Sequence, residues 1–138
     1  VLLLERAKLV AEGAGAAAVA ALVYGKVRMP GARTVAVVSG GNVDLNTLVR
    51  VVDRGLMKTG RLLRLHTRLL DRPGSLRQLL EVVAREGANV VTVEHDRLAP
   101  DVPVGEADVT LLVETRDAEH ARLLLTQVRR AGFSVHGD

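Results

Sequence analysis

Cysteine and tryptophan are absent from the 138 residues, and tyrosine and phenylalanine occur once each. Without cysteine the chain can have neither a disulfide framework nor a thiolate metal site, which agrees with a reducing, cytoplasmic location. The apolar 48% of the residues must therefore pack mainly through alanine, valine and leucine. Length and apolar content together predict one or two small globular domains.

The low net charge, the few aromatic residues and the short apolar stretches argue against binding to nucleic acids or membranes. The net charge is only +3, because basic and acidic residues are interspersed along the whole chain. Bases of single-stranded nucleic acid stack on aromatic rings, and Tyr24 and Phe133 are too few to provide such a platform. The longest weakly polar stretch, residues 13–24, is shorter than the roughly 20 apolar residues that span a bilayer. We expect no nucleic-acid partner and no membrane role.

The first 58 residues predict an incomplete α/β unit. The opening Val-Leu-Leu-Leu-Glu-Arg lacks an initiator methionine and a signal-peptide pattern, and is typical of a cut end. Residues 1–24 predict one helix that packs closely through its small residues, and residues 34–38 predict a short strand buried on both faces. A second helix follows, with Asp44 or Asn42 as its cap.

A lone strand leaves its backbone N–H and C=O groups without ladder partners. We therefore expect the strands that complete this unit to come from a missing N-terminal portion of the same protein.

The second half alternates strands and helices in a complete pattern. Residues 62–69 place leucine and threonine on one face and arginine and histidine on the other, as in a half-buried strand. The next helix ends at Gly87 and has two competing starts, with Asp71 as its cap or with Ser75 as its cap and Gln78 completing a capping box. Either start leaves free N–H groups.

Two more strands, a helix and a final strand are predicted at residues 89–97, 106–115, 117–131 and 133–136. Asp117 and Glu119 stand at the positive end of that last helix, where acidic side chains are favourable. The predicted class is α+β, a ferredoxin-like βαββαβ plan with both helices on one face of an antiparallel sheet. That plan hosts many unrelated functions.

Particular residues narrow the choice. The run Leu-Asp-Arg-Pro-Gly-Ser-Leu at 70–76, followed by Gly-Ala-Asn-Val at 87–90, resembles the signature of the ACT family over residues 61–138. The resemblance implies that a small amino acid binds where two such domains pair, with effector-binding residues Asp71, Arg72, Pro73, Gly74, Ser75, Leu76 and Asn89.

The chemistry of these residues agrees with that role. Gly74 lets the backbone approach a ligand, free N–H groups at a helix start can receive a carboxylate, and Asn89 offers both a donor and an acceptor. Turn chemistry alone also explains Asp71, Pro73 and Gly74 as a tight turn, and Asn89 as a helix exit.

The first half resembles the end of the catalytic domain of the threonine ammonia-lyases, pyridoxal-phosphate enzymes of fold type II. The matching runs are Glu-Arg-Ala-Lys-Leu-Val-Ala-Glu-Gly-Ala-Gly at 5–15, Val-Val-Ser-Gly-Gly-Asn-Val-Asp at 37–44 and Arg-Gly-Leu at 54–56. The predicted domains are thus residues 1–58, a catalytic-domain tail, and residues 61–138, an ACT regulatory domain.

The resemblance implies that Ser39 lies beside the pyridine nitrogen of pyridoxal 5'-phosphate and that Gly40 and Gly41 allow close approach. Asn42 belongs to the same run, and Glu12 matches a position near the cofactor, although it could equally be a surface group. Without the resemblance, Ser-Gly-Gly-Asn is only a turn and a weak candidate for an anion-binding loop.

The family's Schiff-base lysine context, Ser-Phe-Lys, and its glycine-rich phosphate loop do not occur here. Lys8, Lys26 and Lys58 stand in unrelated contexts, and the four histidines lack metal-ligand spacing. We therefore expect no catalytic residue, no metal and no bound cofactor in this chain alone, which should be inactive.

The resemblances together imply the regulatory part of an enzyme that deaminates L-threonine to 2-oxobutanoate and ammonia. Isoleucine or valine would bind in a homodimer or homotetramer and shift it between two quaternary states, and residues 44–58 would carry the change to Ser39. Two alternatives stay open: an ACT-type oligomerisation module without a ligand, and a free-standing amino-acid-binding regulator. In a free-standing regulator the apolar strand at residues 34–38 would remain an exposed edge prone to aggregation, which argues against the second alternative.

Overall fold

The computed structural model describes residues 1–137, and for residues 136 and 137 it describes the backbone alone. Two compact units make up the chain, Val1–Val52 and Asp53–Asp138. Helix α2 (Leu45–Lys58) runs across this division. The domain boundary at residues 58–61 stays a prediction, and the last residue of the predicted second domain, Asp138, lies outside the described residues.

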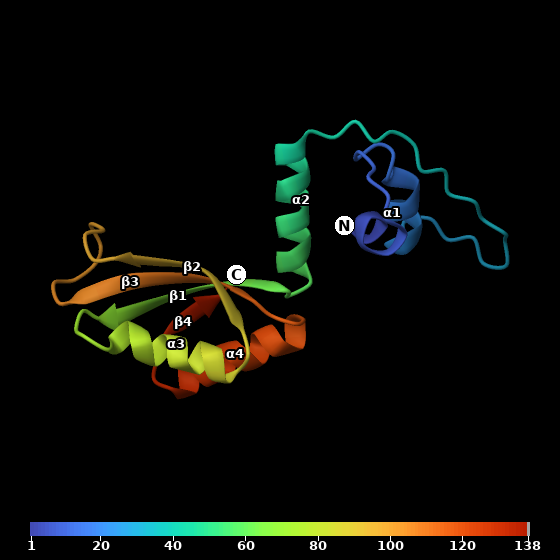
Figure 1. The fold of residues 1–138 in the computed structure, drawn as a ribbon. Helices are drawn as coiled ribbons and strands as arrows, with labels where there is room; N and C mark the ends of the chain where they lie inside the picture. The colour runs from blue at the N-terminus through green and yellow to red at the C-terminus, as the bar shows by residue number, and fades with distance from the viewer. Residues whose placement is uncertain (138) are drawn as a thin grey trace. The chain divides into compact units, whose positions relative to one another are not determined.

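The second unit is a four-stranded antiparallel sheet with two helices on one face. Its strands are β1 (Leu62–Leu70), β2 (Asn89–Asp96), β3 (Glu106–Glu114) and β4 (Val135–Gly137), in the spatial order β2-β3-β1-β4. Helices α3 (Ser75–Arg85) and α4 (Ala118–Arg130) lie on the same side of the sheet (Figure 1). This arrangement confirms the predicted α+β, ferredoxin-like βαββαβ fold.

The core follows from the alternation in the central strands. Leu63, Leu65, Thr67 and Leu69 of β1 are buried, whereas the residues that alternate with them, Arg64, His66 and Arg68, are exposed. β3 pairs with β1 so that Leu111 lies opposite Leu65, and the helices cover both strands with aliphatic side chains. Each fully buried side chain of this kind stabilises the fold by about 1.5–3 kcal/mol. The largest are Leu65, Leu79, Val83, Val109, Leu111, Val113, Leu124 and Val128.

The two helices begin differently. Asp117, predicted only as an acidic residue at the start of the helix, caps α4, because its Oδ1 accepts hydrogen bonds from the amides of Glu119 at 3.0 Å and His120 at 2.8 Å. Neither predicted cap of α3 is correct. Gly74 is its N-cap, with φ of 94° and no side-chain cap bond, because glycine alone enters this left-handed backbone without strain.

The junction before β1 is held against the start of α4. Gly60 has φ of 67°, and a Cβ added there would lie 2.6 Å from the amide nitrogen of Ala118. The hydroxyl of Thr115 donates to the Gly60 carbonyl, and the Thr115 amide donates to the Arg61 carbonyl at 3.0 Å. The segment between α2 and β1 is therefore a packed junction rather than a loose linker.

In the first unit two predictions are wrong. Instead of one helix over residues 1–24, the structure has a short π-helix η1 (Leu3–Ala7) and α1 (Ala17–Val23). The interruption includes two glycines, which each cost about 1 kcal/mol inside a helix. One of them, Gly15, packs its backbone against residues 39–40 instead.

Residues 34–38 do not form a strand, and Val35 and Val37 are 88% and 71% exposed. No strand pairs with this segment in the described part of the chain, so it has nothing with which to form a ladder. The predicted second helix is present as α2, and the Asp44 carboxylate rather than Asn42 caps it, accepting from the Thr47 amide at 2.9 Å.

No helix within residues 1–137 is long and apolar enough to cross a membrane.

Candidate functional site

A surface hollow of about 390 Å³ lies where β1 ends and α3 begins. All six loop residues that the sequence analysis selected for effector binding line it. Two residues from the end of β2 and the turn after it, His95 and Arg97, complete the wall. The full lining is Leu70, Asp71, Arg72, Pro73, Gly74, Ser75, Leu76, His95 and Arg97.

An ion pair joins two side chains that lie on opposite walls of the hollow. A carboxylate oxygen of Asp71 lies 3.4 Å from an Nη atom of Arg97, and the two side chains are 29% and 58% exposed. The backbone of Asp71 is fixed independently, because its amide donates to the Gly105 carbonyl at 2.8 Å. The Asp71 backbone therefore keeps this bond whether or not Arg97 is paired with the carboxylate.

The rest of the lining combines polar backbone with apolar side chains. The amides of Leu76 and Arg77 in the first turn of α3 donate no hydrogen bond to an acceptor among residues 1–137. Leu70, Pro73 and Leu76 supply carbon surface beside them. The hollow thus offers both charges and an aliphatic wall to a small molecule.

Asn89 is not part of this hollow. It begins β2, whereas His95 and Arg97 stand at the other end of that strand and just beyond it. The Asn89 side-chain amide donates to the carboxylate of Glu114 on β3 at 3.0 Å. Within one chain, the structure therefore separates Asn89 from the other six predicted effector residues.

His95 and Arg97 were not selected from the sequence. Both belong to the stretch predicted as a strand, but nothing local distinguishes them as ligand-binding residues. They reach the hollow because β1 and β2 both pair antiparallel with β3, which places the ends of β1 and β2 at the same end of the sheet. The order of the strands in the sheet, rather than a sequence motif, places His95 and Arg97 at the hollow.

In the first unit, Glu12 lies beside the Ser-Gly-Gly-Asn run. The Glu12 amide donates to the Gly40 carbonyl at 3.0 Å. A Cβ added at Gly40 would lie 3.0 Å from the Glu12 carboxyl carbon, and one added at Gly41 would lie 3.2 Å from the Val10 carbonyl oxygen. The chain's own atoms thus fill the space beside each glycine.

Ser39 and Asn42 are exposed in the same segment, and their side chains make no hydrogen bond to the described residues. A serine hydroxyl can donate to a pyridine nitrogen without adding a full charge, which fits the ring side of pyridoxal phosphate. That these residues contact the cofactor ring stays a prediction.

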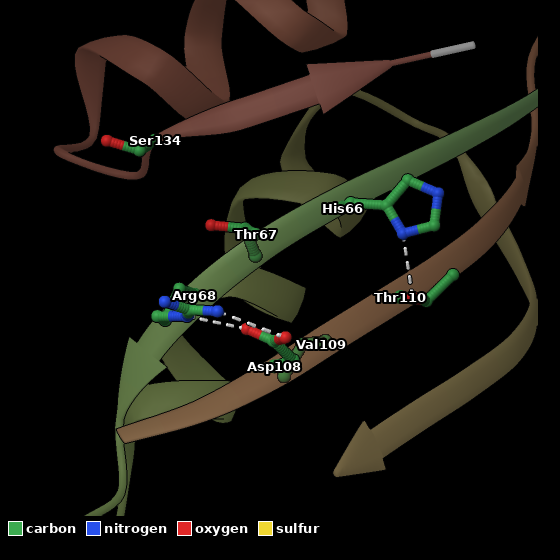
Figure 2. A pocket seen from close by; sticks show the side chains of 7 residues that line it. All are labelled: His66, Thr67, Arg68, Asp108, Val109, Thr110 and Ser134. Carbon is green, nitrogen blue, oxygen red and sulfur yellow. Dashed lines mark hydrogen bonds and ion pairs between the residues drawn. The ribbon is translucent and has the colours of Figure 1, made fainter. Parts of the chain in front are cut away.

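A second hollow, of about 350 Å³, lies over β1 and β3 with Ser134 at its rim (Figure 2). Arg68 donates to both carboxylate oxygens of Asp108, at 2.7 and 3.3 Å, and this bond lowers the pKa of Asp108 and raises that of Arg68. His66 Nδ1 lies 2.9 Å from the Thr110 hydroxyl. The hydroxyl of Thr67 is buried without a partner among the described residues.

None of the predicted site residues lines this second hollow. Among residues 1–137, no group of three or more histidine, cysteine, aspartate or glutamate side chains could hold a metal ion.

Curated relatives match nearly all of the chain. It is 45% identical over 133 residues to the L-threonine ammonia-lyase of Thermotoga maritima and 42% identical over 135 residues to that of Geobacter sulfurreducens. These alignments cover 96% and 98% of this chain but only 33% and 34% of those proteins. The chain spans about a third of the length of these relatives. No family model matches it.

A shorter match is 47% identity over 57 residues, 39% of this chain, to the catabolic L-threonine dehydratase TdcB of Staphylococcus aureus, of which it covers 16%. Solved structures similar to 56% of this chain include the ACT domain of the GTP pyrophosphokinase of Chlorobium tepidum, at 16% identity over 96% of that domain with a TM-score of 0.44. Over nearly its whole length, the chain corresponds to a C-terminal part of the L-threonine ammonia-lyases that it matches.

Proposed function

We propose that this chain is the amino-acid-sensing, regulatory C-terminal part of a cytoplasmic threonine ammonia-lyase, which converts L-threonine to 2-oxobutanoate and ammonia. The observation that carries the proposal is the similarity to such enzymes at 42–45% identity over nearly the whole chain, together with a regulatory-type βαββαβ domain. The catalytic lysine would belong to the remaining two thirds of the enzyme.

In the intact enzyme, residues of the first unit would contact pyridoxal 5'-phosphate, which supplies an electron sink when bound. Ser39 would hydrogen-bond the ring nitrogen through its exposed hydroxyl. Gly40, Gly41 and Asn42 would shape the backbone beside the ring, and Glu12 would fix that backbone through the bond between its amide and the Gly40 carbonyl. This chain alone should hold no cofactor and catalyse nothing.

An aliphatic amino acid, isoleucine or valine, would bind in the hollow made by Asp71, Arg72, Pro73, Gly74, Ser75 and Leu76. The unbonded amides in the first turn of α3 and the arginines suit a carboxylate, and Asp71 suits an ammonium group. The carbon surface of Leu70, Pro73 and Leu76 suits a branched aliphatic side chain. Hydrophobic contact of this kind favours such a ligand by about 0.8 kcal/mol per buried CH₂.

A second copy of the chain would complete the site. β2 is an edge strand of eight residues, and it has none of the lysine or proline residues that often protect an edge from pairing. If two β2 edges pair antiparallel about a two-fold axis, the start of one strand lies opposite the end of the other. Asn89 of the partner subunit would then approach the hollow at His95 and Arg97.

The covalent connection gives a route from effector to cofactor. α2 is one continuous helix from Leu45 to Lys58, and it leads from the Ser39 segment to β1. Its C-terminal end is joined to the start of α4 through Gly60 and Thr115. A change in the paired domains would therefore reach the cofactor-contacting residues through a packed junction.

Thermal unfolding of the chain with isoleucine, valine, threonine and serine tests the proposal. A ligand that binds only the folded state stabilises it by RT ln(1 + [L]/Kd), about 2.7 kcal/mol at a concentration of 100 times Kd. A concentration-dependent rise in melting temperature with isoleucine or valine is expected. No shift with any of the four, in a folded dimer by analytical ultracentrifugation, would contradict sensing and favour an oligomerisation module, which the free β2 edge also supports.

A further inference from the structure

The proposed effector hollow contains a paired acid and base on opposite walls. Asp71 stands in the β1–α3 loop and Arg97 just after β2, so the 3.4 Å ion pair bridges two segments that are 26 positions apart. Such an exposed pair contributes only about 0–1 kcal/mol to stability. Separating it therefore costs the folded chain little.

An amino acid carries the same two charges as this pair, at adjacent carbon atoms. We propose that the Asp71–Arg97 ion pair is the specificity element of the hollow: the ligand's ammonium takes the place of Arg97 on Asp71, and its carboxylate takes the place of Asp71 on Arg97. This inference rests on the proposed function and names the two groups that restrict the ligand to a zwitterion.

The surroundings fit an exchange of partners. The Asp71 amide donates to the Gly105 carbonyl, so the backbone of Asp71 keeps this bond when Arg97 moves away. Arg97 is the more exposed partner, on a side chain with more rotatable bonds. Arg72 lines the same hollow and makes no ion pair within residues 1–137, which adds a positive charge on the side of the carboxylate.

Selectivity follows from the charges that remain. A ligand without an ammonium group would leave Asp71 facing its carboxylate, and a ligand without a carboxylate would leave Arg97 facing its ammonium group. Sites that bind a substrate's polar group reject analogues that lack it, because the site's own group is then left unpaired. The carboxylate analogue without an ammonium group and the amino-acid amide should therefore both bind weakly.

Isothermal titration of the chain with L-isoleucine and L-valine, L-isoleucinamide and 3-methylpentanoate tests the inference. Arg97→Gln and Asp71→Asn should each weaken binding of the amino acid about tenfold or more, since each removes one charge-assisted contact. Arg122→Gln and Asp101→Asn remove the same charges outside the hollow and should leave affinity unchanged. Circular dichroism checks that every variant is folded.

The analogues separate a direct contact from a structural effect. In Arg97→Gln, the preference for isoleucine over isoleucinamide should shrink, because one of the groups that distinguish the carboxylate from the amide is gone. In Asp71→Asn, isoleucine and 3-methylpentanoate should converge in the same way. Unchanged isoleucine affinity in both variants, or unchanged preference over the analogues, would overturn the inference while amino-acid sensing stands. No amino-acid binding by the unaltered chain would overturn both.

Discussion

Replacing Gly60 with alanine measures how firmly the junction between α2 and β1 is packed. Alanine at a left-handed φ of 67° costs about 1–2 kcal/mol from backbone strain. Its Cβ would also lie 2.6 Å from the amide nitrogen and 2.9 Å from the Cβ of Ala118, so the start of α4 must shift. Overpacking of this kind costs about 1–3 kcal/mol. The expected total loss is about 2–5 kcal/mol.

Gly87→Ala is the matched control for this change. Gly87 has φ of 74°, close to that of Gly60, but a Cβ added there would meet no atom within 4 Å. It should therefore show the backbone strain without the collision. Urea unfolding followed by circular dichroism gives the comparison. At an m-value of about 2 kcal/mol per molar urea, a difference of about 2 kcal/mol moves the midpoint by about 1 M.

Equal losses in Gly60→Ala and Gly87→Ala would refute the packed junction, because strain alone would then explain both. The same pair of variants tests the coupling route in the intact enzyme. If Gly60→Ala leaves the response of activity to effector unchanged, the junction does not carry the signal.

The remaining predictions concern one buried hydroxyl and one helix cap. Thr67→Val should raise the free energy of unfolding by about 1 kcal/mol, because it removes a buried hydroxyl that has no partner among the described residues. Thr110→Val removes a hydroxyl next to His66 Nδ1 and should not stabilise, and urea unfolding of both variants makes the comparison. The pKa of Asp117 is lowered by hydrogen bonds from the backbone amides of His120 and Glu119. The contribution of Asp117 to stability is therefore present above its unfolded-state pKa and is lost as pH falls through the folded-state pKa. Asp117→Asn keeps a capping oxygen but removes this titration. The melting temperature of the variant should therefore fall less than that of the unaltered chain between neutral pH and about pH 3. Equal falls in melting temperature for the two proteins would contradict this role of Asp117.

The sequence predicted the second unit well because its patterns are local. Alternation in β1 identified the buried Leu63, Leu65 and Leu69 without knowledge of the sheet. Asp117 as an acidic residue at the start of α4 and Gly87 as the terminator of α3 are also local features, and the structure has both. The start of α3 escaped prediction because Asp71 and Ser75 are good capping residues that the backbone geometry at Gly74 leaves unused.

The first unit was predicted less well because its elements depend on distant partners. The apolar residues 34–38 have the composition of a strand, but a strand forms only when a neighbour supplies ladder bonds. Gly15 was counted as a helix residue, yet its role is a close approach to residues 39–40. The loop residues of the proposed effector hollow were predicted from a sequence motif. The position of His95 and Arg97 in the hollow depends on the order of strands in the sheet, which no single segment encodes.

The unequal edges of the sheet limit how many copies can add to it. One edge is β2 with eight residues, and the other is β4, with three residues in the part of the chain that the structure describes. Pairing through β2 uses the same edge on both copies, so a two-fold dimer exhausts the long edges and presents only short ones. A continuous sheet of many copies would require β4 to serve as a template, and three residues offer few ladder bonds. If copies pair through β2 as proposed, this asymmetry favours a closed dimer over a growing fibre.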